Sequence, residues 1–332
     1  MKTRPPAGPA SLPEFLQTPA VATGSLHCPR TTSRAAATPT FFATVRCITL
    51  LPLSLSLLLP VSATAASAAA PKPHAVFVVG TLHYSPELSL PLFAQELQRF
   101  GFRTTVIKGE GDPEKKTENV LPGIGVLAEA DVMIFFTRFL QLPDREWQPI
   151  ENYLKSGKPV IGLRTASHAF KYPKGHPRYN WNDDFGRRAI GTPYIVHQTG
   201  TTQVSVVPKY RTHPIMSHVA KTQWVSPGTL YLTRLQGGCV PLLTGTGKGT
   251  FRLMEKEFGP IQVHEQEADI VAWAWKNEWG GKVFGTSLGD PGDFAEESFT
   301  RMLVNSVCWA VEKPVPGPDE KISTWNLKRT DK

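Results

Sequence analysis

The sequence predicts an α/β protein in which helices cover both faces of a doubly wound, mostly parallel sheet, forming a three-layer α/β/α sandwich. Two observations lead to this prediction. Short apolar runs alternate with amphipathic segments of helical spacing along most of the chain. Polar residues or glycines follow the apolar runs, where a buried strand would reach the surface. Because crossovers between parallel strands are right-handed, this alternation produces a doubly wound sheet.

The strands are expected at short runs of apolar residues. HAVFVVG is such a run, and it ends at a glycine as a buried strand often does. DVMIFFT and PVIGL have the same character. A turn at 278–281 joins the last two strands. The expected strands are 74–80, 102–107, 131–137, 159–163, 268–275 and 281–289.

The helices are expected where apolar residues recur every three or four positions. Gly101 and Gly157 follow two of these segments and are typical helix stops. The region 164–250 is less regular and includes a strand-like run at 201–207. The expected helices are 87–100, 118–129, 143–155 and 293–312.

The termini are expected to lie outside the folded domain. Residues 1–45 are rich in proline, alanine, serine and threonine, which is typical of a disordered leader or of a start codon assigned too far upstream. Residues 46–70 begin with a basic residue, continue with an apolar run and end in A-x-A sites, which indicates a secretory signal peptide. The domain then spans 71–313, and the Pro- and Lys-rich tail 314–332 is expected to be loose.

The net charge of the chain and the apolar run within residues 46–70 indicate where the protein is located and which partners it binds. The 332-residue chain carries a formal charge of +8, and residues 1–70 hold five basic residues and one acidic residue, so a cleaved chain would carry +4. The remaining Lys and Arg residues are scattered, so no nucleic-acid partner is expected. The apolar run is short and interrupted by prolines, so no stable membrane insertion is expected after cleavage. The protein is thus expected to be periplasmic or secreted.

Two cysteines follow the predicted signal peptide. Cys239 and Cys308 could pair in an oxidising compartment. Cys308 lies within an apolar helical pattern, where a buried free thiol is an equal alternative. The sequence has no CxxC motif and no zinc-finger spacing. It leaves open whether the protein forms a homo-oligomer.

Polar side chains from distant parts of the chain are predicted to meet at one edge of the sheet. Ligands of doubly wound sheets bind beyond the carboxyl ends of the strands, and each residue in this set lies at or just after the end of an expected strand or strand-like run. The set is Thr81, His83, Tyr84, Arg138, Arg164, Thr165, Ser167, His168, His197, Ser287, Asp290 and Asp293.

Asp290 and Asp293 could have structural roles instead, and so could the strand-to-helix turn at 157–170, which we call the elbow. Asp293 begins a D-x-x-E pattern, so it could be the N-cap of the last helix. Asp290 precedes a proline and could only shape a turn. At 157–170, a strand runs into a tight turn and a helix, the arrangement in which many hydrolases place a nucleophile, but the turn residue is Arg164. The following N–H groups of the predicted helix, near Ser167 and His168, would favour oxygen ligands.

The chain resembles the trehalose-utilisation (ThuA-like) family over about residues 74–312. This family is a branch of the class I glutamine amidotransferase-like superfamily, which implies a flavodoxin-like sheet. The matching segments are GKPVIGLRTASHAF (157–170), WNDDFGRRAIGTPYIVH (181–197), THPIMSHV (212–219), GTLYLT (228–233) and GKVFGTSLGDPGDFAEESFTRMLVNSVCWAVE (281–312).

The chain departs from the pattern of its relatives at three places. Amidotransferases of this fold have a nucleophilic Cys where this chain has Arg164, so glutaminase chemistry is excluded. ThuA-like proteins often have His at that position. The His of their TSLGH-like segment is Asp290 here, and the acidic pair before Leu-Tyr is Gly228-Thr229.

The resemblance implies a role in carbohydrate catabolism, around oxidised (keto) glycosides. The first hypothesis is an isomerase, lyase or hydrolase in which His83, His168 or His197 is a general base, Asp290 orients it, and Arg164 polarises a carbonyl. A variant of this hypothesis has two of these histidines and Asp290 holding a divalent metal cofactor. The second hypothesis is a non-catalytic carbohydrate-binding module that stacks sugars on Tyr172, Tyr179 and Trp181.

Overall fold

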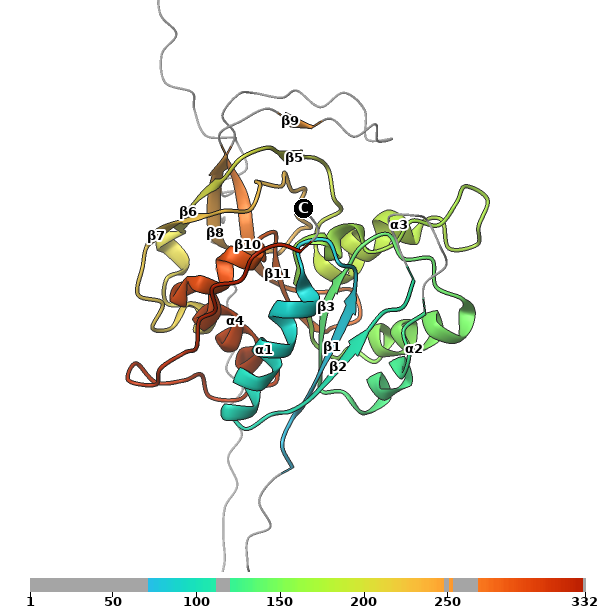
Figure 1. Cartoon of the computed structure of the whole chain (residues 1–332), viewed down its shortest axis with the longest axis horizontal. Helices are drawn as coiled ribbons and strands as arrows, with labels where there is room; N and C mark the ends of the chain where they lie inside the picture. The colour runs from blue at the N-terminus through green and yellow to red at the C-terminus, as the bar shows by residue number, and fades with distance from the viewer. Residues whose placement is uncertain (1–70, 112–119, 248–250, 253–267, 331–332) are drawn as a thin grey trace, which may run out of the picture. The chain divides into compact units, whose positions relative to one another are not determined.

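The computed structural model describes residues 71–111, 120–247, 251–252 and 268–330. The predicted leader and signal segment, residues 1–70, lie outside the described residues. The described residues form a doubly wound sheet with helices on both faces, as the sequence predicts (Figure 1). In this part of the chain no helix is long and apolar enough to cross a membrane.

The central sheet has nine strands in the order β2-β1-β3-β4-β11-β10-β8-β6-β7. The first five pair in parallel: β2 (Arg103–Lys108), β1 (His74–Gly80), β3 (Val132–Thr137), β4 (Val160–Leu163) and β11 (Lys282–Thr286). The other four extend the sheet with antiparallel pairing: β10 (Ala268–Lys276), β8 (Val240–Gly247), β6 (Thr202–Val206) and β7 (Gln223–Ser226). The irregular middle of the sequence therefore builds much of the antiparallel part.

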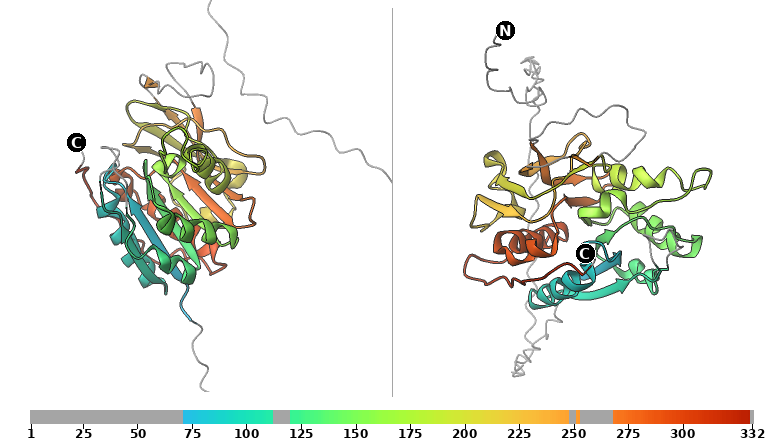
Figure 2. Two further views of the ribbon diagram at one scale, coloured as in Figure 1. Left: turned by 90° about the vertical axis from the view of Figure 1, so that its right-hand side faces the viewer. Right: turned by 45° about the horizontal axis from the view of Figure 1, so that its top comes forward.

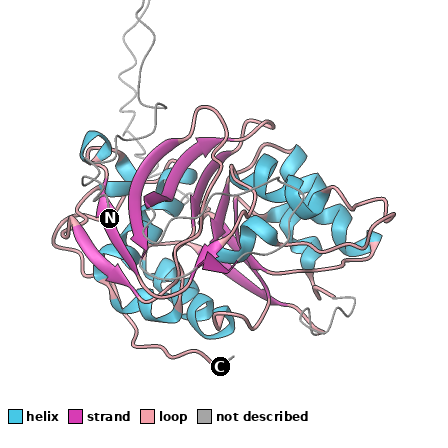
Figure 3. Ribbon diagram, turned by 90° about the horizontal axis from the view of Figure 1, so that it is seen from above, coloured by secondary structure: helices cyan, strands magenta, loops and turns pink. Residues whose placement is uncertain are grey.

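Both faces of the inner parallel strands β1, β3 and β4 are buried, which explains their continuous apolar sequences. Every residue of β1 is buried. Because side chains alternate along a strand, Phe77 faces the cluster that contains helices α1 (Pro86–Arg99) and α4 (Glu297–Ala310). Val78 faces the cluster that contains α2 (Asp144–Lys155). Figure 2 shows the sheet between these two helical layers, and Figure 3 shows its twist from above.

Helix α2 has the amphipathic pattern that the sequence predicts. Trp147, Ile150, Tyr153 and Leu154 are buried in the core on one side of the sheet. The helix ends at Gly157, which has a φ of 71°. A side chain there would be strained, and a Cβ would lie 2.6 Å from the Trp279 carbonyl oxygen. Gly157 is thus confirmed as the stop.

Three expected elements differ in detail. The segment expected as a helix over 118–129 contains a 3₁₀ helix, η3 (Ile124–Glu129), and its first residues lie outside the described ones. The last helix begins at Glu297 rather than 293, because a separate 3₁₀ helix, η8 (Pro291–Ala295), precedes it. The turn residues of the elbow form only a five-residue 3₁₀ helix, η4 (Arg164–His168). The elbow is therefore not followed by a long helix whose N-terminus could bind a ligand.

The prediction of a loose C-terminal tail is wrong for residues 314–330. Ile322 is buried in the core, and the backbone N–H of Trp325 donates to the Phe294 carbonyl oxygen at 2.8 Å. The Arg301 guanidinium of α4 donates to the carbonyl oxygens of Gly317 and Glu320. A few apolar anchors and these bonds fix a segment that has no regular helix or strand.

Candidate functional site

Strained backbone gathers at the carboxyl ends of the parallel strands. Among the described residues, six non-glycine residues have positive φ. Four of them follow strand ends: Tyr84 and Ser85 after β1, Phe139 after β3, and Arg164, at 45°, after β4. Such conformations are unfavourable and persist where the surrounding structure enforces them, often at functional sites. The turn after β4 has a strained backbone although its residue, Arg164, is not a nucleophile.

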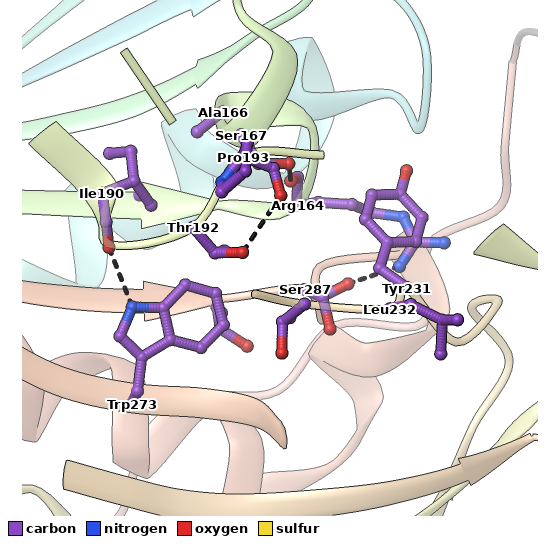
Figure 4. Close-up of a pocket in the computed structure, with 13 residues that line it drawn as sticks. Arg164, Ala166, Ser167, Ile190, Thr192, Pro193, Tyr231, Leu232, Trp273 and Ser287 are labelled. Atoms are coloured by element: carbon purple, nitrogen blue, oxygen red, sulfur yellow. Dashed lines mark hydrogen bonds between the residues drawn. The ribbon is translucent and has the colours of Figure 1, made fainter. Parts of the chain in front are cut away.

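Arg164 is buried within this region instead of projecting from it. It is 1% exposed. One terminal nitrogen of its guanidinium donates to the Ser287 carbonyl oxygen at 2.6 Å, and the other donates to the Thr229 hydroxyl at 3.1 Å. Figure 4 shows Arg164 passing Tyr231 and reaching Ser287. These buried contacts within the protein give no support to the expectation that Arg164 polarises a substrate carbonyl.

Two tyrosine rings enclose the guanidinium. Its central carbon lies 3.9 Å from the ring centroid of Tyr84 and 4.8 Å from that of Tyr231. Burial opposes the charge of Arg164, but these tyrosines and the nearby Asp290 and Asp293 outweigh it and raise its pKa. Arg164 is thus a fixed positive charge inside the site.

The three departures from the family pattern lie together around this charge. Thr229 accepts a hydrogen bond from Arg164, and Asp290 acts on it electrostatically. A Cβ at Gly228 would lie 2.8 Å from a terminal nitrogen of Arg164. A larger residue at 228 would therefore compete with the guanidinium for space. Arg164, Gly228, Thr229 and Asp290 form one local arrangement rather than separate changes.

The buried charge of Arg164 lowers the pKa of Tyr84. Burial alone would raise its pKa. The charge of Arg164, with hydrogen bonds involving Tyr231, Arg164 and Thr229, outweighs burial and lowers the pKa of Tyr84 to about 8. Burial and the neighbouring Tyr84 instead raise the pKa of Tyr231 well above its ordinary value. Of these two tyrosines, Tyr84 is the one that can exchange a proton near neutral pH.

Two of the three predicted histidines meet at a second tyrosine. The hydroxyl of Tyr194 is hydrogen-bonded to Nδ1 of His197, which is half-buried. The buried ring of His168 lies 4.3 Å from that of Tyr194. Both histidines also face Tyr231, at ring distances of 5.9 and 5.7 Å. His168 and His197 are thus linked through Tyr231 to the Arg164 arrangement.

His83 and Arg138 lie at the same ends of the sheet. The half-buried ring of His83 is 4.3 Å from that of Tyr84. Arg138, also half-buried, lies over the Phe139 ring at 4.2 Å, and that ring is 5.4 Å from His168. The structure therefore brings the polar residues that follow β1, β3 and β4 together, as the topology predicts.

Asp290 and Asp293 have mainly structural contacts. The Asp290 carboxylate accepts the Gly292 N–H at 3.2 Å, and Asp293 accepts the N–H groups of Gly289 and Asp290 at 2.7 and 2.9 Å. These bonds form a capping box for η8. The interpretation of Asp293 as the cap of the last helix is wrong, because Glu296 caps α4. The proposed role of Asp290 in orienting a histidine has no support in these contacts.

Asp293 makes the stability of the protein depend on pH. Burial raises its pKa from 3.8 to about 6, although hydrogen bonds from Ser226 and Gly289 and the Arg164 charge oppose this. The carboxyl group of Asp293 therefore binds its proton more tightly in the folded state than in the unfolded state. The resulting stabilisation is complete below about pH 4 and is lost as pH rises through 6.

We expect Asp293→Asn, which stays neutral and keeps an acceptor oxygen, to lose this dependence. Between pH 4 and 7 the variant should gain stability relative to the wild type, by at most about 3 kcal/mol, since one pKa unit corresponds to about 1.4 kcal/mol. Urea unfolding of both proteins across this range measures the difference. A difference that does not change with pH would contradict the assignment.

The remaining predicted ligand-binding residues do not form an open site. Thr165 is fully buried, and Ser167 is hydrogen-bonded to Nδ1 of His168 at 3.3 Å. A cavity of about 10 Å³ beneath the elbow, bordered by Arg164, Ser287 and Trp273, has room for about one water molecule (Figure 4). It is too small for a sugar.

Trp181 lies away from this site, in an aromatic cluster. It begins the short helix α3 (Trp181–Asp184), and its ring lies 4.6 Å from Trp147 and 6.5 Å from Trp279. These packing contacts give no support to the prediction that Trp181 binds substrate. Its apolar surface packs the helical layer that contains α2.

The described residues contain no group of three or more His, Cys, Asp or Glu side chains that could hold a metal ion. Two of the predicted histidines and Asp290 therefore do not form the expected ligand set. Cys239 and Cys308 are both free, so the pairing alternative is wrong. Burial raises the pKa of these thiols to about 12 and about 11, which makes them poor nucleophiles.

Sequence reasoning placed Tyr84 among the polar residues at the strand ends but gave it no role, and it missed Tyr194 and Tyr231. Tyr84 follows the first strand next to His83, but its pKa depends on Arg164, which is 80 residues away in sequence. Tyr194 lies three residues before His197, and Tyr231 lies in the GTLYLT segment. A search for tyrosines next to the candidate histidines would have singled out Tyr84 and Tyr194.

The fold and the strained elbow define a protein of the class I glutamine amidotransferase-like type in which an arginine replaces the nucleophile. A sequence profile of the ThuA family, described as "Trehalose utilisation", matches residues 76–310. The chain belongs to this family.

Solved structures of ThuA-like proteins are similar to this chain. One from Bacteroides uniformis ATCC 8492 has 18% sequence identity and a TM-score of 0.49, covering 76% of this chain and 96% of that protein. Another from Parabacteroides merdae ATCC 43184 has 14% identity and a TM-score of 0.49, covering 74% of this chain and 92% of that protein. No curated protein sequence matches the chain.

Proposed function

We propose that this protein is an enzyme of carbohydrate catabolism that acts on oxidised (keto) glycosides by histidine acid–base chemistry. The family description, trehalose utilisation, supports the substrate class. The observation that carries the catalytic part is the Tyr194–His197 pair. The phenol of Tyr194 orients the half-buried imidazole, and in the tautomer whose Nδ1–H donates to the phenol oxygen the ring lone pair is on Nε2, the state that a general base needs.

The chemistry needs a base rather than a nucleophile. A keto group acidifies the C–H bond beside it. In the proposed step, Nδ1–H of His197 donates to the Tyr194 oxygen, so that Nε2 has the lone pair and takes the substrate proton, and the C–H electron pair becomes part of an enolate. The enolate then regains a proton, which is an isomerisation, or expels the glycosidic oxygen, which is an elimination. His168 is placed to supply the proton for either outcome.

Arg164 supports this chemistry indirectly. Its charge lowers the pKa of Tyr84 to about 8, so the phenol of Tyr84 titrates near neutral pH. Ionisable groups with shifted pKa values favour catalysis over simple binding. Two of the three aromatic residues considered for sugar stacking are used in packing: Tyr172 is 3% exposed with its ring stacked on that of Phe170, and Trp181 packs against Trp147. This weakens the alternative of a non-catalytic binding module.

The location is part of the proposal. Residues 46–70 have the pattern of a signal peptide, which supports a periplasmic or secreted protein. The N-terminus of the exported protein, read by mass spectrometry, tests this, and an intact residue 46 would contradict it.

The activity is tested by incubating the full chain with disaccharides and their keto derivatives, followed by NMR. We expect new product signals with a keto glycoside and none with the parent sugar. A second series with a chelator shows whether a divalent metal takes part. Line broadening of the sugar without any product would contradict the enzyme and favour the binding module.

A further inference from the structure

The C-terminal segment ends at the candidate site. After the anchors at Ile322 and Trp325, the chain reaches the loop that follows β1. There the Thr330 N–H donates to the Ser85 hydroxyl at 2.8 Å, and the Thr330 hydroxyl donates to the Glu87 carboxylate at 2.9 Å. Ser85 is fully buried and belongs to the strained backbone of the site. We call residues 314–330 the C-terminal strap.

The strap places a second guanidinium on Tyr84. The central carbon of Arg329 lies 4.2 Å from the ring centroid of Tyr84, and that of Arg164 lies 3.9 Å from it. Both guanidiniums therefore contact the ring of Tyr84. Arg329 is half-buried, whereas Arg164 is buried. Tyr84 thus has one buried cation and one half-buried cation beside it.

Arg329 also contacts His83. A terminal nitrogen of its guanidinium lies 3.4 Å from Nδ1 of His83. Arginine can only donate, so this contact requires Nδ1 to accept. In a neutral His83 the ring proton is then on Nε2. One side chain of the strap thus touches both titratable residues of the β1 loop.

We propose that Arg329 is a positioning residue of the site, brought there by the C-terminal strap, and that it sets the proton states of Tyr84 and His83. The importance of these proton states for catalysis rests on the function proposed above. Among the described residues, the charged and titratable groups that face Tyr84 include His83, Arg164, Tyr231 and Arg329. Of these, Arg164 and Arg329 are permanent cations, and Arg329 is the one that a substitution can remove without opening the core.

The test is a pH titration of the full chain with carbon-13-labelled tyrosine, in which Tyr84→Phe identifies the Tyr84 signal. In Arg329→Gln we expect the pKa of Tyr84 to rise above about 8, because a cation over the ring that favours the phenolate is lost while Arg164 remains. Arg329→Lys keeps the charge and should give a smaller rise. Lys328→Gln removes an exposed neighbouring cation and should leave the titration unchanged.

An unchanged Tyr84 titration in Arg329→Gln would overturn the inference, whatever the enzyme activity. A rise of similar size in Lys328→Gln would also overturn it, because the effect would then come from net charge. If the wild type turns over a keto glycoside, its pH–rate profile should shift in Arg329→Gln with the titration. A shifted titration in a protein without turnover would support the electrostatic role of Arg329 and contradict only the proposed function.

Discussion

Replacing His197 by alanine is expected to lower kcat on a keto glycoside by about 10²- to 10⁴-fold, the usual contribution of a general base. The expectation rests on the bond between Tyr194 and Nδ1 of His197, which orients the imidazole. Substrate affinity should change little, because the base acts in the transition state. Steady-state kinetics that separate kcat from KM measure both quantities.

Two further variants make this prediction specific. Tyr194→Phe removes the bond to His197 but leaves the imidazole, so kcat should fall less than in His197→Ala. His176→Ala removes a histidine that is stacked on Tyr172, outside the site, and should keep wild-type kcat. If His197→Ala weakens binding and leaves kcat intact, the base is a different residue. His168→Ala would then be the next variant to measure.

Replacing Arg164 by alanine is expected to lower the free energy of unfolding by about 3–5 kcal/mol, the usual effect of breaking a buried charged network. The Ser287 carbonyl loses its donor, two tyrosine rings lose the cation between them, and Asp293 loses a nearby positive charge. For a domain of this size the change corresponds to a fall in Tm of roughly 6–20 °C. Urea unfolding and thermal melts measure the effect.

Arg103→Ala is the matched control for this variant. Arg103 pairs with Glu129 at 3.3 Å, and both side chains are more than half exposed. Exposed pairs contribute at most about 1 kcal/mol, so this change should be nearly silent. If Arg164→Ala does not fold, Arg164→Lys keeps the charge and provides a milder test. Equal stability losses in Arg164→Ala and Arg103→Ala would show that the buried guanidinium does not stabilise the fold.

Gly228→Ala tests the local arrangement directly. A Cβ there would lie 2.8 Å from the Arg164 guanidinium, so the single variant should be destabilised. In the double variant with Arg164→Ala this clash is absent, and the combined loss should be smaller than the sum. Strict additivity would contradict a direct conflict between the two positions.

The parallel part of the fold could be predicted because its determinants are local. The apolar run 74–80 is buried on both faces, and α2 buries the residues that its spacing indicates. The convergence of His83, Arg138 and His168 also followed from topology, since the carboxyl ends of parallel strands share an edge. The antiparallel strands β6, β7 and β8 were weaker signals, because their residues are not continuously buried and so do not form uninterrupted apolar runs.

The strap shows why the C-terminal prediction failed. Its composition, rich in Pro and Lys, is typical of a loose tail. A few side chains nevertheless find buried partners on α1, α4 and the η8 segment, including Ile322 and Trp325. The overall composition of the segment does not reveal these few anchoring side chains. Their partners are distant in sequence, so local patterns do not reveal them either.

The sequence by itself determined the α/β class, the position of the site at the strand ends, the loss of the nucleophile and the resemblance to the ThuA family. Only the tertiary structure decided the role of each polar residue. Arg164 is a buried charge, Asp293 is part of a capping box, and Trp181 belongs to the core. The physical reason is that burial and charge pairing depend on neighbours brought together by folding. A residue type at a strand end predicts where a side chain lies but not which groups surround it.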